Sequence, residues 1–91
     1  MDQAVILSTA RTPIGKAYRG SFNDTDAPTL ASYAINGSIA KAGIDPSEVE
    51  DVIMGAAVQQ GTQGYNIGRL SAAASGLPIH VPGMSVDRQC A

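Results

Sequence analysis

Three apolar runs along the chain predict strands. Residues 4–7 (AVIL) and residues 51–58 (DVIMGAAV) have the length of buried strands, and residues 84–87 (MSVD) form a third, shorter run. A continuous apolar run is typical of a parallel strand, because both faces of such a strand are covered. We therefore expect three strands, of which the first two are buried.

The segment between the first two runs has the spacing of a helix. Asp26 can cap its start, Pro28 falls in the first turn, and Gly43 closes it. The residues that recur on one face are Leu30, Ala34, Ile35, Ile39 and Ala42. Gly37 interrupts this helix at a cost of about 1 kcal/mol relative to alanine, and a close neighbouring backbone would explain it.

Two further helical segments follow. Asp45, Pro46 and Glu48 form an arrangement like a capping box at the start of a short turn. Residues 66–75 predict a short helix that Gly76 ends. Its expected apolar side consists of Ile67, Leu70, Ala73 and Ala74.

The order strand, helix, strand, helix, strand predicts an α/β fold. Right-handed crossovers would place the strands parallel in one sheet. Cys90 then lies just past the carboxyl end of the third strand, at the edge of the sheet where ligands bind in open α/β folds.

The composition indicates a piece of a larger body. Charged residues make up 15% of the 91 residues, against about 25% in a typical soluble domain, while apolar residues make up 44%. A small free-standing domain has proportionally more surface to cover with charge. The alternative is a small alanine-rich domain that tolerates a weakly charged surface.

Charge and hydropathy exclude several classes of function. The net charge is −2 and the basic residues are scattered, so nucleic-acid binding has no electrostatic basis. No apolar stretch approaches the roughly 18 residues that span a membrane. The amino terminus lacks the basic start and cleavage site of a secretion signal, and a single cysteine fits a reducing compartment, so we expect a cytoplasmic protein.

Cys90 is the candidate nucleophile. A free thiol has a pKa of about 8.5, and the amino terminus of a following helix would favour the thiolate. A strand-to-helix turn would also aim backbone N–H groups at a developing oxyanion. The structural alternative is that Cys90 is a small buried side chain, as single cysteines often are.

Other polar residues have simpler interpretations. His80 is the only histidine, and its place between two prolines predicts a solvated loop. The glycine-rich residues 61–69 match neither phosphate-loop pattern, so we expect a loop packed against another chain or domain. Arg69 is expected to pair with a carboxylate or carbonyl, Lys16 and Arg19 are expected to be loop cations, and no cluster has metal-ligand spacing.

Taken together, these segments resemble the amino-terminal part of a thiolase, the family of acetyl-CoA acetyltransferases and 3-ketoacyl-CoA thiolases. The segments that carry the resemblance are ARTPIG (10–15), AGIDP (42–46), VIMG (52–55), NIGR (66–69), GLP (76–78) and VPGMSVDRQCA (81–91). Tyr65 stands where many members have Gln, and Gln89 where Leu or Val is common. These two departures leave the subfamily open.

The resemblance implies a fold and a role for the thiol. Residues 1–91 would be the first portion of a thiolase amino-terminal domain, a βαβαβ unit with a mixed, mostly parallel sheet covered by helices. The matching cysteine is the nucleophile that accepts the acyl group, and its backbone N–H contributes to an oxyanion hole, which assigns both roles to Cys90. The family's other catalytic motifs, Gly-His-Pro and Cys-x-Gly, do not occur here, nor does its CoA-binding loop.

The implied reaction is acyl transfer between CoA thioesters, with acyl-CoA as substrate and no tightly bound cofactor or metal. It would run as condensation of two acetyl-CoA molecules or, in reverse, as cleavage of a 3-ketoacyl-CoA. The implied partners are the remainder of the chain and further copies, in a homodimer or homotetramer. The alternatives are a non-catalytic thiolase-like protein that binds lipid or assembles with a partner, and a decarboxylating ketoacyl synthase, against which the ARTPIG start argues.

Overall fold

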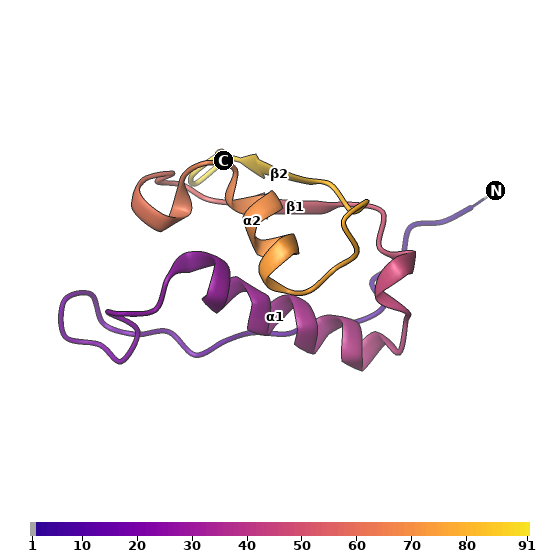
Figure 1. The fold of residues 1–91 in the computed structure, drawn as a ribbon, viewed down its shortest axis with the longest axis horizontal. Helices are drawn as coiled ribbons and strands as arrows, with labels where there is room; N and C mark the ends of the chain where they lie inside the picture. Colours follow the sequence, from indigo (N-terminus) through magenta and orange to yellow (C-terminus); the bar gives the residue numbers. More distant parts are fainter. Residues whose placement is uncertain (1) are drawn as a thin grey trace.

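Two parallel strands, two α-helices and two 3-10 turns make up the computed structural model, which describes residues 2–91. In chain order the elements are α1 (Ala27–Ala42), η1 (Pro46–Glu48), β1 (Val52–Gly55), η2 (Gly61–Gln63), α2 (Ile67–Ala74) and β2 (Gly83–Val86). Figure 1 shows them in layers, with the strands on one side, α2 next to them and α1 beyond α2. The α/β class that the sequence predicts is confirmed.

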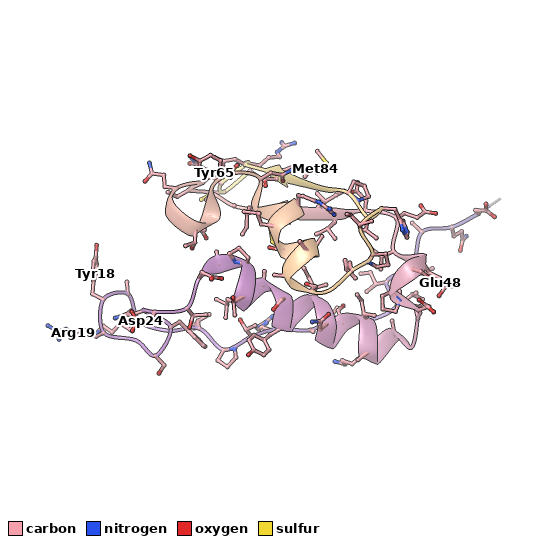
Figure 2. The ribbon with its side chains drawn as sticks, viewed as in Figure 1. Tyr18, Arg19, Asp24, Glu48, Tyr65 and Met84 are labelled. Carbon is pink, nitrogen blue, oxygen red and sulfur yellow. The ribbon has the colours of Figure 1, made fainter. Side chains whose placement is uncertain are left out.

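The strands β1 and β2 pair in parallel, as expected. Val52 pairs with Gly83 and Ile53 pairs with Met84. Side chains alternate between the two faces of a strand, so Ile53 and Met84 share the face opposite to the helices. Ile53 is 64% exposed and Met84 points away from the helices in Figure 2. The second face of this sheet is therefore open in the described chain.

Helix α1 begins and ends where the sequence predicts. A carboxylate oxygen of Asp26 accepts a hydrogen bond of 2.8 Å from the backbone N–H of Thr29, and Gly43 closes the helix at φ 68°. A Cβ added to Gly37 would lie 3.4 Å from the Cβ of Ala10. The expected close neighbour of Gly37 is therefore present, although it is a side chain of the amino-terminal segment and not a backbone.

The capping box at η1 is confirmed. Asp45 accepts a bond of 2.9 Å from the backbone N–H of Ser47, and its own N–H donates to the Glu48 carboxylate at 3.1 Å. These two reciprocal bonds satisfy backbone donors that a turn of this kind leaves free.

The prediction of a buried strand over residues 4–7 is wrong for the described chain. The segment is extended but pairs with no strand, and Val5, Ile6 and Leu7 are 71%, 86% and 69% exposed. The residues that follow are bound to α1 instead: the Ser8 hydroxyl donates to the Ser38 carbonyl at 2.6 Å, and Lys41 Nζ donates to the Thr9 carbonyl at 2.9 Å. An apolar run becomes a buried strand only where a neighbouring strand and a covering layer are available, and residues 2–91 provide neither here.

The second predicted strand is shorter and less buried than expected. Strand β1 covers Val52–Gly55 of the predicted residues 51–58, and its residues alternate between half-buried and exposed. The helices cover one face of the sheet only, which explains why a continuous apolar run is half exposed. The third strand agrees with its prediction to within one residue at each end.

Helix α2 presents a different face from the predicted one. Its buried residues are Ile67, Gly68, Ser71 and Ala72, whereas Leu70 is 39% exposed. The reason is a close approach of two backbones: a Cβ added to Gly83 would lie 2.5 Å from the Arg69 backbone nitrogen. Because the helix lies directly on β2, Gly68, Ser71 and Ala72 face inward beside Ile67, and Leu70 faces outward.

The core of the described chain is small. Buried Ala72, Leu77 and Val81 form its centre, and the partly buried residues around it are Ile35, Ile39, Val49 and Val52. Many large apolar side chains remain exposed, which agrees with the weakly charged composition. Within residues 2–91, no helix is both long and apolar enough to cross a membrane.

Candidate active site

Cys90 lies where the sequence places it, four residues beyond the end of β2. Since β1 and β2 are parallel, this is the edge at which both strands end. The thiol is free and exposed. Among residues 2–91 nothing covers the sulfur, and the role of Cys90 stays a prediction.

The thiol belongs to a tight turn formed by residues 87–91. The Asp87 carboxylate accepts a hydrogen bond of 3.2 Å from the Gln89 backbone N–H, and the Arg88 carbonyl accepts one of 2.6 Å from the Ala91 N–H. Gln89 between them has φ 47°, in the left-handed region that non-glycine residues seldom adopt. Asp87, Arg88 and Gln89 therefore bend the chain sharply just before Cys90.

A shallow depression of about 360 Å³ lies at the same edge. The residues that line it are Gly55, Ala56, Ala57, Val86, Arg88 and Gln89. Ligands of open α/β sheets bind beyond the carboxyl ends of the strands, and this depression is formed by the residues at those ends. Its lining is mostly small and apolar, with Arg88 as its cation.

His80 does not lie beside Cys90. It is exposed, as predicted, and it precedes β2 whereas Cys90 follows it. A strand of four residues rises by about 13 Å, so the imidazole and the thiol lie at opposite ends of the strand. The structure therefore gives His80 no role as the base that activates Cys90.

The glycine-rich segment is fastened to its own chain. Thr62 Oγ1 accepts a bond of 3.0 Å from the backbone N–H of Ala27 at the start of α1, and Gln63 donates to the Val58 carbonyl at 2.5 Å. Arg69 donates from Nη1 to the Val81 carbonyl at 2.6 Å and from Nη2 to the Ile79 carbonyl at 3.3 Å. The prediction that Arg69 pairs with a carbonyl is confirmed, and the packing of residues 61–69 against another chain or domain stays a prediction.

Asn66 and Ser85 form a contact that the sequence did not predict. Asn66 caps α2 and also donates from Nδ2 to the Gly83 carbonyl of β2 at 2.9 Å. The Ser85 hydroxyl donates to Asn66 Oδ1 at 3.1 Å. The available signal was an asparagine at a helix start, because asparagine both caps helices and tolerates left-handed backbone. Nothing in that signal indicates a partner 19 positions later.

The remaining predictions concern two loop cations and metal-ligand clusters. Lys16 and Arg19 are exposed in the loop before α1, and Figure 2 shows Arg19 at the tip of that loop. Within residues 2–91, no group of three or more His, Cys, Asp and Glu side chains could hold a metal ion.

The chain matches known proteins over nearly its whole length. The sequence model of the family described as Thiolase, N-terminal domain, matches residues 4–91. The chain is 38% identical over 87 residues to a 3-ketoacyl-CoA thiolase of Saccharophagus degradans, which covers 94% of the chain and 22% of that relative. It is 38% identical over 90 residues to a 3-ketoacyl-CoA thiolase of Bacillus subtilis, covering 99% of the chain and 23% of the relative.

An acetyltransferase matches equally well. The chain is 40% identical over 91 residues to the mitochondrial acetyl-CoA acetyltransferase of Danio rerio, covering 100% of the chain and 21% of that protein. The chain thus spans less than a quarter of the length of each of these three relatives. A family match that extends from residue 4 to residue 91, together with the parallel α/β arrangement, identifies the chain as a member of the thiolase family, matched in its amino-terminal domain.

Proposed function

We propose that Cys90 is the nucleophile of a thiolase-type acyltransferase that acts on CoA thioesters. The single observation that carries the proposal is the place of the thiol: it is exposed, it follows a parallel strand by four residues, and it lies at the edge of the sheet that holds a shallow depression. Relatives that match the chain are named 3-ketoacyl-CoA thiolase and acetyl-CoA acetyltransferase, which supports acyl transfer as the class of reaction.

In the synthetic direction, the Cys90 thiolate attacks the carbonyl carbon of one acetyl-CoA. The carbonyl electron pair moves to oxygen, and the tetrahedral oxyanion then collapses and expels CoA as its thiolate, which takes up a proton. The acetyl group remains on Sγ as a thioester. A second acetyl-CoA, deprotonated at the carbon next to its carbonyl, attacks this thioester and releases both acetoacetyl-CoA and the Cys90 thiolate.

The covalent intermediate divides one difficult carbon–carbon bond formation into two easier steps. Cleavage of a 3-ketoacyl-CoA is the same sequence in reverse. Of the groups that this chemistry needs, residues 1–91 supply the nucleophile and, by the resemblance, one backbone N–H for the oxyanion. The family's base and second cysteine belong to motifs that do not occur in these residues.

The test is to expose the full polypeptide to acetyl-CoA and to map the modified peptides by mass spectrometry. We expect one acetyl group on the peptide that contains Cys90, and no adduct in the Cys90→Ala variant. In the Cys90→Ser variant the rate of acetoacetyl-CoA formation should fall by at least about 1000-fold, because a serine hydroxyl is a far weaker nucleophile than a cysteine thiolate.

Full activity without an adduct on Cys90 would contradict the proposal. An inactive chain that forms no adduct but binds a fatty acid or a partner protein would instead support the non-catalytic alternative. The two readings are separated by one measurement on the unsubstituted chain, because only the catalytic reading requires a covalent thioester.

We also propose that the protein is a homo-oligomer, as the resemblance implies. The open sheet face with Ile53 and Met84 would be covered by the remainder of the polypeptide or by a second copy, so the resemblance alone supports this proposal. A molar mass in solution equal to one polypeptide, measured by light scattering at micromolar concentration, would overturn it.

A further inference from the structure

Within residues 2–91, one edge of β2 is bonded by a side chain and not by a strand. The carbonyl of Pro82 accepts from the Val52 N–H and the carbonyl of Val86 accepts from the Ala56 N–H, so the even-numbered carbonyls of β2 face β1. Carbonyls alternate in direction along a strand, and the Gly83 carbonyl therefore faces the other way. Asn66 Nδ2 donates to it at 2.9 Å, in the position that a neighbouring strand would otherwise occupy.

Ser85 completes the contact on the face that packs against α2. Its hydroxyl donates to Asn66 Oδ1 at 3.1 Å and accepts from the Gly68 backbone N–H at 3.1 Å. Asn66 Oδ1 also accepts from the Arg69 backbone N–H at 3.3 Å. Three hydrogen bonds through two side chains thus join the start of α2 to β2, and the fourth caps the helix itself.

The backbone of Asn66 adopts an uncommon conformation at this contact. Asn66 has φ 61° and ψ 72°, a left-handed conformation that is uncommon outside glycine and that asparagine adopts more readily than most other residues. Such a conformation persists where the surroundings determine it strongly, and these conformations cluster near functional sites. Here the hydrogen bonds to Gly83 and Ser85 accompany it.

We propose that Asn66 and Ser85 are positioning residues for Cys90, an inference that rests on the proposed function. Ser85 lies five residues before the thiol, and β2 has a partner strand on one edge only within residues 2–91. Reacting groups must be held to within about 0.5 Å, and a displacement of about 1 Å can lower a rate by about 100-fold. A strand free to tilt about its single ladder would carry the turn of residues 87–90 with it, and the Asn66–Ser85 contact prevents that tilt.

The experiment compares four variants of the full chain. Ser85→Ala removes both hydroxyl bonds, Ser85→Thr keeps the hydroxyl, and Asn66→Gly removes the side chain while retaining a residue that tolerates left-handed backbone. The matched control is Ser75→Ala, which removes another serine hydrogen bond of α2, the one of 2.7 Å to the Ser71 carbonyl at the opposite end of the helix. For each variant, kcat, KM, the rate of acetyl transfer to Cys90 and the melting temperature are measured.

We expect kcat and the rate of acetyl transfer to fall by about tenfold or more in Ser85→Ala and Asn66→Gly. KM should change by less than about threefold, because a misplaced nucleophile reduces transition-state stabilisation more than it reduces substrate binding. Ser85→Thr should restore kcat to within about threefold of the unsubstituted chain, and Ser75→Ala should leave it unchanged at a comparable loss of melting temperature.

Equal losses of kcat in Ser85→Ala and Ser75→Ala at matched melting temperature would overturn the inference, since both variants would then act through stability alone. An unchanged kcat in Ser85→Ala would overturn it too, while the proposed function stands. If the unsubstituted chain forms no acetyl adduct on Cys90, the proposed function fails and the positioning role falls with it.

Discussion

At the scale of single residues, Ser71 is the least satisfied polar group. Its side chain is fully buried, and within residues 2–91 its Oγ is the buried side-chain oxygen that has no hydrogen-bond partner. A buried hydroxyl without a partner loses its hydration and gains nothing in exchange.

We therefore expect Ser71→Ala to raise the free energy of unfolding by about 1 kcal/mol, since alanine removes the unpaired oxygen and is the better helix former. Ser71→Thr should do the reverse, because it keeps a hydroxyl and adds a methyl group at a site without space. Urea unfolding of the three proteins measures both. A destabilised Ser71→Ala would show that the hydroxyl has a partner in solution.

A second prediction concerns Asp26, whose carboxylate caps α1. Hydrogen bonds from the Thr29 hydroxyl and backbone N–H hold the pKa of Asp26 below its ordinary value of 3.8. A carboxyl group with a lowered pKa in the folded state stabilises the protein above its ordinary pKa and loses that contribution as the pH falls through the folded value. Melting temperature should therefore fall as the pH drops below about 4.

The Asp26→Asn variant isolates this effect, because asparagine caps helices without titrating in this range. Its melting temperature should depend less on pH below about 4 than that of the unsubstituted chain. Part of the acid sensitivity should remain, because hydrogen bonds from the Ser47 backbone and hydroxyl also lower the pKa of Asp45. Equal acid sensitivity in both proteins would contradict the role of Asp26.

Local chemistry made several residues predictable. Asp26, Gly43 and Asp45 cap their helices as expected, because a cap bonds backbone groups two to four positions away. Cys90 follows its strand for the same reason, since the end of β2 is a local feature. The partners of Asn66 and Arg69 lie 10 to 19 positions along the chain, and only the fold brings them near.

At the scale of elements, the contact between α2 and β2 is the tightest in the described chain. A Cβ on Gly68 would overlap the backbone of Met84, and a Cβ on Gly83 would lie 2.5 Å from backbone atoms of Gly68 and Arg69. Backbone atoms cannot move aside as a flexible side chain can, so the two elements would have to separate.

We expect Gly68→Ala to lower the free energy of unfolding by about 2 kcal/mol or more, even though alanine is the better helix former, because overpacking against a backbone outweighs that gain. Gly55→Ala is the matched control, since an added Cβ at Gly55 meets nothing within 4 Å. Chemical denaturation of both variants provides the measurement. A Gly68→Ala protein as stable as Gly55→Ala would show that α2 does not lie so close to β2 in solution.

Two of the departures from the expected elements illustrate the effect of packing. Residues 4–7 are apolar enough for a buried strand, but neither a pairing strand nor a covering layer meets them within residues 2–91. The apolar side expected for α2 included Leu70, Ala73 and Ala74, whereas the buried side contains Gly68, Ser71 and Ala72, and Ile67 belongs to both. Periodicity shows that a helix has two faces, and the neighbour decides which of them is buried.

At the scale of the whole molecule, α2 is bound to the segment that includes β2 through two residues at its amino-terminal end. The Asn66 contact holds its first turn to β2, and the Arg69 guanidinium binds two carbonyls of the connection that leads into β2. The core beneath it is small, so we expect the loss of these polar links to be measurable as a loss of stability.

We expect Arg69→Ala to lower the free energy of unfolding by about 2 kcal/mol, because it leaves the carbonyls of Ile79 and Val81 without their charged donor. Arg69→Lys should recover only part of the loss, because an ammonium group cannot reproduce the planar fork of a guanidinium. Arg19→Ala, in the exposed loop, is the control and should change stability by less than about 0.5 kcal/mol. Thermal and urea unfolding measure all three, and equal effects at Arg69 and Arg19 would contradict the assignment.

The sequence by itself determined the α/β class, the caps of α1 and η1, the parallel direction of β1 and β2, and the place of Cys90 after the last strand. These features depend on spacing and on neighbours within a few residues, which the sequence states directly. Only the tertiary structure decided which face of α2 is buried, where the residues after the first apolar run are bound, and that Asn66 reaches Ser85. Those outcomes depend on how closely two backbones can approach and on which surfaces find a partner, and both are settled only when the elements pack.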